Sequence, residues 1–546
     1  MAPLHPPRAA TGERLVPRDA LPPQLRPLFH HEYFNAMQSA VFELAFGSDT
    51  PLVVAAPTGS GKTAVLELVL ARLWSTQSDD IRPAAVYIAP LKALTTERLN
   101  DWAPRFSAAL GIKCCELTGD SVEDEEQAVQ AAQLIITTPE KWDAFTRFRR
   151  SEGVVGRIGL LLVDEIHLLH DKGRGPTLES IIGRMKLVAQ SPMVRGLPVS
   201  RLRMLAISAT IDNVGDIAQW IRPDCVARTF DESYRPVPLQ WHVVSYRMGK
   251  TFAFDALLAS HLLQVVRKYN NGRPALVFCN SRKAAQSAAV AVSSAPGGAF
   301  VRRDSAQVLG EASRGIVDVA LRGMVARGVA FYSAALDVAD KRAVEQLFLH
   351  GHLGVVCSTT GLAQGVNLPA HLVVICNTCH YQNGGYEEYS RIEVLQMAGR
   401  AGRPQFDTSG VCVVMTRDEM KAHYSRLLSG TETIESHMVE HMAAHLNAEI
   451  AFQRQMSDVA ACIDWLKASF AYVRIKRNPN FYGQLAAGAT EAELEGHLRT
   501  LCMRHIRCLE QHGLLAFDAD GVAVRPLPLG TIMARHYLEL DTVPPP

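Results

Sequence analysis

The sequence predicts an α/β fold in which two successive parallel sheets, each flanked by helices, precede a mostly helical region. Apolar strands and amphipathic helices alternate over residues 41–235, and the alternation starts again over residues 236–430. Residues 437–540 show the apolar spacing of helices joined by short turns. A chain of 546 residues has room for about three to four domains, each able to bury its own core.

The amino-terminal segment has a different composition. Residues 1–28 carry many prolines and charges of both signs, and they lack the apolar core of a signal peptide. We therefore expect a disordered tail there. No apolar run approaches the length that a membrane-spanning helix needs, so no membrane partner is expected.

The first predicted strand, Leu52–Ala55, runs directly into a glycine-containing loop that is followed by the amphipathic stretch 64–74. This order of strand, tight loop and helix is what a phosphate-binding loop requires, because its backbone N–H groups then face the phosphates. Lys62 can reach the β and γ oxygens, and the hydroxyl of Thr63 can hold Mg²⁺. The pattern predicts ATP as a cofactor, bound by Ala56, Pro57, Thr58, Gly59, Ser60, Gly61, Lys62 and Thr63.

A second predicted strand, Ile158–Val163, ends in the acidic pair Asp164 and Glu165. Asp164 would hold Mg²⁺, mostly through its waters, and Glu165 would orient and deprotonate the attacking water. Paired acids after a strand are commonly a solvated strand end or a helix cap. The phosphate-binding loop, together with Ser208-Ala209-Thr210 at the end of another strand, favours the catalytic interpretation.

A third motif contains Gln396 and the arginines Arg400 and Arg403, which are flanked by glycines. Two arginines three residues apart would lie on one helical face, where they could clamp a γ-phosphate from another domain. The alternative is a surface helix stabilised by ion pairs. The predicted nucleotide site favours the clamp, so Gln396, Arg400 and Arg403 join Asp164 and Glu165 as predicted catalytic residues.

With these motifs in order, the chain resembles superfamily-two helicases, specifically the Ski-like branch with tandem RecA-type domains. The stretches that carry this resemblance include an adenine-reading element with Gln38, two strand-contacting motifs, and two motifs of the second RecA-like domain, namely Phe34–Gln38, Ala89–Leu94, Thr137–Asp143, Val277–Arg282 and Thr359–Pro369. Further stretches are similar to the MER-type meiotic crossover DNA helicases of the HFM family, namely Arg174–Glu179, Pro369–Val374, Glu387–Ser390, Gly402–Thr408 and Arg477–Gly483.

The resemblance covers roughly residues 31–540. It implies a RecA-like ATP-binding domain over 31–235, a second RecA-like domain over 236–430 and a winged-helix domain over 431–541. Family members continue into a helical ratchet domain, for which we expect no room in this chain. The sequence departs from the family at Tyr332-Ser333, where two histidines are usual, and at Gly361, where a hydroxyl residue is usual.

The resemblance implies an ATP- and Mg²⁺-dependent DNA helicase of 3′ to 5′ polarity that acts in the nucleus on branched meiotic recombination intermediates. DNA would be bound as a single strand and as branched duplex, and no pattern identifies a protein partner. The implied strand contacts are made by residues in or beside the motifs, namely Lys92, Arg98, Thr138, Lys141, Arg282 and Thr359. Two alternatives remain open: an RNA helicase of the Ski or spliceosomal type, and an ATP-binding interaction module that does not unwind.

Tyr381 and Tyr386 flank Asn383-Gly384, a dipeptide typical of a two-residue β-hairpin turn. Related DNA helicases carry a strand-separating hairpin at this point, where the two tyrosines could stack on the last base pair. The alternative is a surface turn with two half-buried tyrosines.

The net charge and the cysteine content limit the possible partners, compartment and cofactors. The net charge of +1 gives no overall electrostatic case for a nucleic-acid partner, so binding has to rest on a local groove. The eleven cysteines are scattered and lie mostly in apolar strands, which indicates buried thiols in a reducing compartment. Cys376, Cys379 and His380 have the spacing of a haem attachment motif, but they fall on a predicted strand and we do not expect haem.

Overall fold

The computed structural model describes residue 9 and residues 11–75, 82–117, 122–147, 151–247, 251–294, 300–302, 304–360, 368–382, 385–402, 407–429, 433–452, 456–483, 486, 488–518, 521–538 and 540. The chain divides into two compact units. The first unit comprises Met1–Ala55, Gly61–Thr229 and Glu432–Pro546, and the second comprises Ala56–Ser60 and Phe230–Thr431. Each unit is described separately below.

The first unit contains a seven-stranded sheet in the order β3-β4-β2-β5-β6-β1-β7, and all pairings are parallel. Its strands are β1 (Leu52–Ala55), β2 (Ala84–Ile88), β3 (Cys114–Leu117), β4 (Leu134–Thr137), β5 (Ile158–Val163), β6 (Arg203–Ser208) and β7 (Val226–Thr229). Every residue of β1, β2, β4, β5 and β6 is buried. Burial on both faces explains why these strands read as continuous apolar runs instead of alternating patterns.

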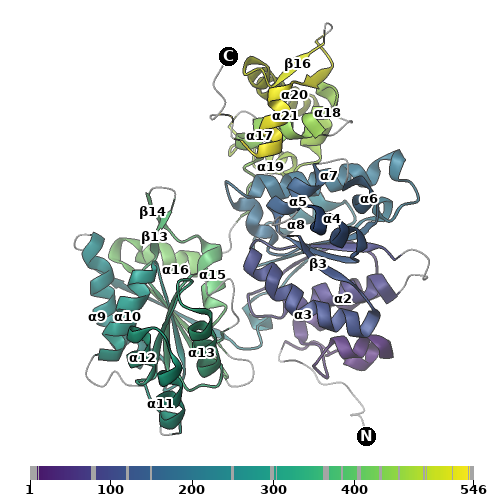
Figure 1. The fold of residues 1–546 in the computed structure, drawn as a ribbon. Helices are drawn as coiled ribbons and strands as arrows, with labels where there is room; N and C mark the ends of the chain where they lie inside the picture. Colours follow the sequence, from purple (N-terminus) through teal and green to yellow (C-terminus); the bar gives the residue numbers. More distant parts are fainter. Residues whose placement is uncertain are drawn as a thin grey trace. The chain divides into compact units, whose positions relative to one another are not determined.

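Helices cover both faces of this sheet. Figure 1 shows α2 and α3 on one side and α5, α7 and α8 on the other. The helices of this part are α1 (Ala36–Phe42), α2 (Lys62–Ser75), α3 (Lys92–Leu110), α4 (Val122–Ala131), α5 (Pro139–Thr146), α6 (Glu152–Gly156), α7 (Gly175–Gln190) and α8 (Val214–Ile221). The core on the side of α5, α7 and α8 is built around Trp142, Ile181 and Ile217.

The predicted disordered tail is wrong for residues 18–28. Arg18–Ala20 and Pro23–Leu28 form short 3₁₀ helices, and the side chains of Leu21, Leu25 and Leu28 are buried. Prolines preset the backbone φ angle that these short helices need, and the intervening leucines supply apolar surface to bury. The high proline content therefore reflects local geometry here and not disorder.

The second unit contains a six-stranded parallel sheet in the order β10-β11-β9-β12-β15-β8. Its strands are β8 (Leu239–Tyr246), β9 (Ala275–Cys279), β10 (Val329–Tyr332), β11 (Val355–Thr359), β12 (Leu372–Cys376) and β15 (Gly410–Arg417). Its helices are α9 (Thr251–Tyr269), α10 (Arg282–Ser294), α11 (Ala306–Gly315), α12 (Val319–Val325), α13 (Val338–Leu349), α15 (Arg391–Ala398) and α16 (Lys421–Ser429). A separate two-stranded antiparallel hairpin consists of β13 (Cys379–Gln382) and β14 (Gly385–Glu388).

The carboxyl-terminal part of the first unit consists of helices and one small antiparallel ribbon with a core of its own. Its elements are α17 (Met438–Phe452), α18 (Val459–Lys467), α19 (Phe470–Arg477), α20 (Glu491–Gln511), β16 (Leu515–Phe517), β17 (Val524–Pro526) and α21 (Pro528–His536). The long helix α20 followed directly by the ribbon is the arrangement of a winged helix. Together with the two parallel sheets, it confirms the predicted fold class.

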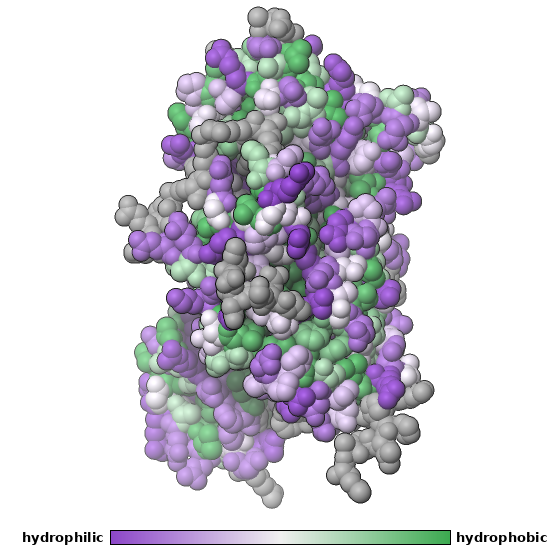
Figure 2. All heavy atoms as spheres, turned by 90° about the vertical axis from the view of Figure 1, so that its right-hand side faces the viewer, coloured by the Kyte–Doolittle hydropathy of each residue, from purple (hydrophilic) through white to green (hydrophobic). Residues whose placement is uncertain are grey.

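Among the described helices, none is long and apolar enough to cross a membrane. On the face drawn in Figure 2, hydrophilic and hydrophobic side chains are interspersed.

Candidate active site

The predicted phosphate-binding loop lies between the buried strand β1 and the start of α2 at Lys62. Gly59 and Gly61 have φ angles of 85° and 86°, in the left-handed region that favours glycine. A Cβ atom on Gly61 would lie 2.5 Å from Nε2 of Gln38. The backbone conformation therefore favours glycine at position 61, and a side chain there would displace the amide of Gln38.

Gln38 connects the first helix to this loop. Its side chain forms a capping box with Asn35, in which the Asn35 N–H donates to Gln38 Oε1 at 3.0 Å. The Nε2 group of Gln38 donates to the carbonyl oxygen of Gly61 at 3.0 Å. Gln38 therefore contacts the phosphate loop directly. Its predicted contact with adenine stays a prediction.

The two acids follow β5, a central strand of the sheet. Glu165 has a φ angle of 52°, a left-handed conformation that costs a non-glycine residue about 1–3 kcal/mol. Its Oε2 atom is buried and has no hydrogen-bond partner among the described residues. His167 Nδ1 lies 3.3 Å from this oxygen without forming a hydrogen bond to it. A strained carboxylate with an oxygen that accepts no hydrogen bond from the described residues is typical of a reacting group and not of a structural one.

Electrostatics separate these acids from ordinary surface carboxylates. Burial raises the pKa of Glu165, and the ammonium of Lys62 opposes that shift. Burial also raises the pKa of Asp164, and the neighbouring Glu165 charge raises it further. Lys62 is itself buried and interacts with both carboxylates. Lys62 therefore faces both anions, and Arg98 adds a second cation on the side of Asp164.

Tyr87, which the sequence did not identify, and Arg98 complete the surroundings of Asp164. The hydroxyl of Tyr87, a fully buried residue of β2, donates to Asp164 Oδ2 at 2.6 Å. The guanidinium of Arg98 on α3 interacts electrostatically with both Tyr87 and Asp164. Arg98 was expected to face a nucleic-acid strand. The structure contradicts this expectation, because its side chain is only 18% exposed and points into the domain.

His167 links the acidic motif to the end of β6. The backbone N–H of Ala209 donates to His167 Nδ1 at 3.2 Å, and Ser208 Oγ lies 3.1 Å from the same nitrogen. Because Nδ1 accepts from an N–H group, the ring proton lies on Nε2. The Ser208-Ala209-Thr210 motif predicted from sequence is thus physically joined to the Asp164 and Glu165 segment.

These donors fit a magnesium–nucleotide complex. Thr63 and Asp164 offer the oxygen atoms that Mg²⁺ prefers, and Lys62 offers a cation for phosphate oxygens. The unpartnered Oε2 of Glu165 leaves an acceptor for a water molecule. Among the described residues no cluster of three His, Cys, Asp or Glu side chains forms a metal site.

The predicted strand-contacting residues of the first unit lie along the edge where the parallel strands end. Lys92, after β2, is exposed at the first residue of α3, and Thr138, after β4, is half-buried before α5. Lys141 is exposed on α5. Arg174 braces this edge, because its Nε donates to Glu140 at 2.7 Å and its Nη2 to the Pro90 carbonyl. Carboxyl ends of parallel strands are where such folds place ligands.

In the second unit, Arg282 is exposed at the start of α10, and Thr359 is half-buried at the end of β11. Gln396 is half-buried on α15. The expected helical face for the two arginines is wrong, because α15 ends at Ala398 and Arg400 lies beyond that end. Arg403, like residues 361–367, lies outside the described residues.

The hairpin has the place and the register that the Asn-Gly signal predicts. Tyr381 pairs with Tyr386 across the two strands, and Gln382 pairs with Gly385, so the turn has two residues. Asn383, Gly384 and the side chain of Tyr381 lie outside the described residues. Tyr386 is 53% exposed. The Asn280 side chain donates to the carbonyl of Cys379 at 3.0 Å, which anchors the hairpin to the end of β9.

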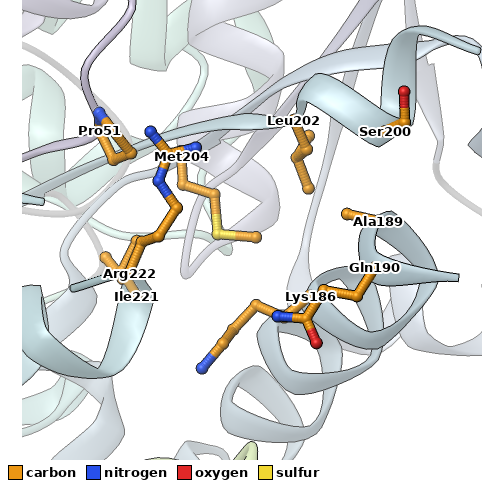
Figure 3. A pocket seen from close by; sticks show the side chains of 9 residues that line it. All are labelled: Pro51, Lys186, Ala189, Gln190, Ser200, Leu202, Met204, Ile221 and Arg222. Carbon is orange, nitrogen blue, oxygen red and sulfur yellow. The ribbon is translucent and has the colours of Figure 1, made fainter. Parts of the chain in front are cut away.

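A small cavity of about 140 Å³ lies elsewhere in the first unit (Figure 3). Pro51 and Leu202, on its wall, precede β1 and β6. The cavity is therefore at the amino-terminal edge of the sheet, opposite the nucleotide loop and the acids. Lys186 from α7 lines it, and burial lowers the pKa of this lysine to about 8.

Two families match parts of the chain. Residues 35–217 match the family described as DEAD/DEAH box helicase, and residues 435–519 match a winged helix-turn-helix domain. The first match spans the phosphate loop and the acidic pair. The second coincides with most of the carboxyl-terminal helical part.

Curated relatives match almost the whole chain. The "ATP-dependent DNA helicase homolog MER3" of Arabidopsis thaliana is 40% identical over 96% of this chain and 48% of its own length. The "Probable ATP-dependent DNA helicase HFM1" of Homo sapiens is 39% identical over 96% of this chain and 37% of its own length. The "ATP-dependent DNA helicase MER3" of Saccharomyces cerevisiae is 34% identical over 98% of this chain and 44% of its own length. These relatives confirm the predicted resemblance, and the chain spans about half of their length or less.

Proposed function

We propose that this chain, which carries a DEAD/DEAH box helicase domain and a winged helix-turn-helix domain, is the motor of an ATP-dependent DNA helicase of the MER type. The substrate would be DNA, bound as a single strand and as branched duplex, with 3′ to 5′ polarity. The setting would be meiotic crossover formation in the nucleus. The relatives' names support ATP use and the DNA substrate, and the meiotic setting rests on the resemblance to the MER-type family.

One observation carries the proposal, namely the geometry of the acidic pair beside the phosphate loop. Glu165 is strained, its side chain is 16% exposed, and its Oε2 atom has no hydrogen-bond partner among the described residues. Lys62 interacts with it electrostatically. A purely structural acid would be expected to have its oxygens satisfied. This arrangement supports a hydrolase more strongly than a protein that only binds ATP.

Each residue of the site has a separate proposed role. Lys62 binds the β and γ oxygens, while Thr63 and Asp164 hold Mg²⁺, which neutralises developing phosphate charge when bound. Glu165 orients the attacking water and accepts its proton, and its raised pKa makes it a stronger base than a surface glutamate. Arg400 and Arg403 would contact the γ-phosphate when a strand is bound.

Strand contacts would be made by exposed and half-buried residues at the carboxyl-terminal edges of the two sheets. Lys92, Thr138 and Lys141 belong to the first sheet, and Arg282 and Thr359 belong to the second. Single strands are held by backbone contacts and stacking, so only a few of these side chains need to be cationic. Tyr381 and Tyr386 would then form a stacking wedge at the end of the duplex.

The test compares nucleic acids on one preparation. We expect ATP hydrolysis to rise when single-stranded DNA is added, to rise less with RNA of the same sequence, and to be lost in Lys62→Ala. A duplex with a 3′ tail should be unwound and one with a 5′ tail should not. Stronger stimulation by RNA would support the Ski-type alternative. No stimulation by either polymer would leave the ATP-binding interaction module.

A further inference from the structure

Helix α3 has an inner face that reaches both halves of the nucleotide site. It begins at Lys92, directly after the first predicted strand-contacting motif. Arg98, Trp102 and Arg105 follow one another at intervals of four and three residues, so they lie on one face of the helix. Trp102 is fully buried, and the side chains of the two arginines are each 18% exposed. This face is part of the interior and not a solvated surface.

The amino-terminal half of this face contacts the Asp164 side of the site. The Tyr87 and Trp102 rings meet edge to face, with centroids 5.0 Å apart. The Arg98 guanidinium lies 5.8 Å from the centre of the Trp102 ring and interacts with Tyr87 and Asp164. The hydroxyl of Tyr87 in turn donates to Asp164 at 2.6 Å. A shift of α3 would therefore move the hydrogen-bond donor that holds the Asp164 carboxylate.

The carboxyl-terminal half of the same face contacts the phosphate-loop helix. Trp102 Nε1 donates to Glu67 Oε1 at 2.9 Å, and Arg105 Nη1 donates to the same oxygen at 2.9 Å. Glu67 belongs to α2, five residues after Lys62, and it is buried. Figure 1 shows α2 and α3 side by side on one face of the sheet. Trp102 thus contacts the helix that carries Lys62 and the Tyr87 ring whose hydroxyl donates to Asp164.

We propose that α3 couples strand binding at Lys92 to Mg²⁺–nucleotide binding, with Tyr87 and Arg98 as positioning residues for Asp164 and Trp102 as the link to Glu67. This proposal rests on the proposed function, because it needs a strand at Lys92 and a nucleotide at Lys62. Buried hydrogen bonds have few alternative partners, so this face has a small number of discrete arrangements. A ligand that selects one of them at Lys92 selects it at Asp164 as well.

The coupling is measurable without hydrolysis. By thermodynamic linkage, a strand that tightens nucleotide binding is itself bound more tightly when nucleotide is present, by the same factor. The affinity for a nonhydrolysable ATP analogue with Mg²⁺ is measured with and without a short labelled DNA single strand. We expect the strand to tighten nucleotide binding by about fivefold to a hundredfold in the parent protein.

Tyr87→Phe and Arg98→Gln should reduce this factor to near one, while the affinity for the strand alone stays close to that of the parent. Tyr87→Phe should also raise the Mg²⁺ concentration needed for half-maximal nucleotide binding, by on the order of tenfold, because a hydrogen bond to a charged group is lost. Arg98→Lys should restore part of the coupling. Asn100→Ala, at an exposed position of the same helix, should keep the parent factor.

An unchanged coupling factor in both Tyr87→Phe and Arg98→Gln would overturn the proposal, as would a parent protein without coupling. If the variants lose strand affinity and nucleotide affinity together, α3 only supports the fold and the proposal is wrong. Failure of the proposed function has a different signature. In that case the coupling is present and altered by the variants, but no ATP is hydrolysed.

Discussion

Two buried groups of acids in the first unit differ in how their charges are compensated. Asp143 and Glu449 share the guanidinium of Arg184, with Nη2 to Asp143 Oδ1 at 2.8 Å and Nε to Glu449 Oε1 at 3.0 Å. Asp164 and Glu165 share Lys62, and Asp164 also interacts with Arg98 and accepts a hydrogen bond from Tyr87. Glu165 Oε2 has no hydrogen-bond partner among the described residues, although His167 Nδ1 lies 3.3 Å from it. Burial alone therefore does not identify a reacting acid. What distinguishes Glu165 is a carboxylate oxygen that accepts no hydrogen bond from a described residue.

The pKa values follow the same division. Burial alone would raise the pKa of Asp143, but Arg184 and Arg147 outweigh it and bring the pKa to about 2. In the other group burial prevails, and the pKa of Glu165 is raised. The compensated group joins three helices, because Asp143 lies on α5, Arg184 on α7 and Glu449 on α17 of the winged-helix part. We therefore expect the first group to govern stability and the second to govern turnover.

The largest expected effect is on turnover. Glu165→Gln should lower the rate of ATP hydrolysis by about 10²- to 10⁴-fold, because the general base is lost. ATP affinity should stay close to that of the parent, since Lys62 and the loop are unchanged. Melting temperature should not fall, because the substitution removes a buried charge whose Oε2 atom makes no hydrogen bond. Hydrolysis at the parent rate would show that the water is activated elsewhere and would remove the contrast between the two groups.

The next effect is on stability. Arg184→Ala should lower the free energy of unfolding by about 3–5 kcal/mol, because Asp143 and Glu449 are then buried without their shared cation. Urea unfolding measures the loss, and hydrolysis per folded molecule should change little.

Arg222→Ala is the matched control. Arg222 pairs with Asp224 at the surface, where the two side chains are 43% and 61% exposed. Removing such a pair costs about 1 kcal/mol or less. Equal losses in the two variants would mean that compensation at Arg184 contributes nothing beyond an ordinary surface pair.

Most of the fold can be predicted from local sequence patterns. The continuous apolar runs of β1 and β5, the Lys62 loop and the Asn383-Gly384 turn each depend on residues that are neighbours in the chain. The contact between Tyr87 and Asp164 does not, because 77 residues separate them and the strand order places β5 beside β2. Nothing in the local pattern of β2 reveals which strand pairs with it.

The structure also differs from the sequence prediction at Arg98 and at Arg400, and both differences have local causes. Arg98 is a charged residue beside a strand-contacting motif, so it reads as exposed, but its helical position turns it toward Trp102. The sequence predicts a helical conformation for Arg400 because the residues before it are helical. Gly402, with a φ angle of 86°, lies just past the helix end, and a Cβ atom there would lie 2.6 Å from Val237 Cγ1. The helix ends where the chain must pass close to a neighbouring segment.

Glu179 provides the last test, because the hydrogen-bond donors of this buried acid, Ser436 and Ala471, carry no charge, and Lys186 interacts with it only electrostatically. Ser436 Oγ donates to it at 2.6 Å and the Ala471 N–H at 2.7 Å, yet burial raises its pKa to about 7 from 4.5. The folded protein therefore binds this proton more tightly than the unfolded chain does. Its stabilising contribution is complete below pH 4.5 and is lost as the pH rises to about 7, by on the order of 3 kcal/mol. Glu179→Gln keeps an acceptor for the Ala471 N–H and carries no charge, so the variant should match the parent near pH 4.5 and exceed it in unfolding free energy at pH 8. If parent and variant differ by the same amount at both pH values, hydrogen bonds alone compensate a buried carboxylate, and a cation is not what separates the structural acids from the reacting ones.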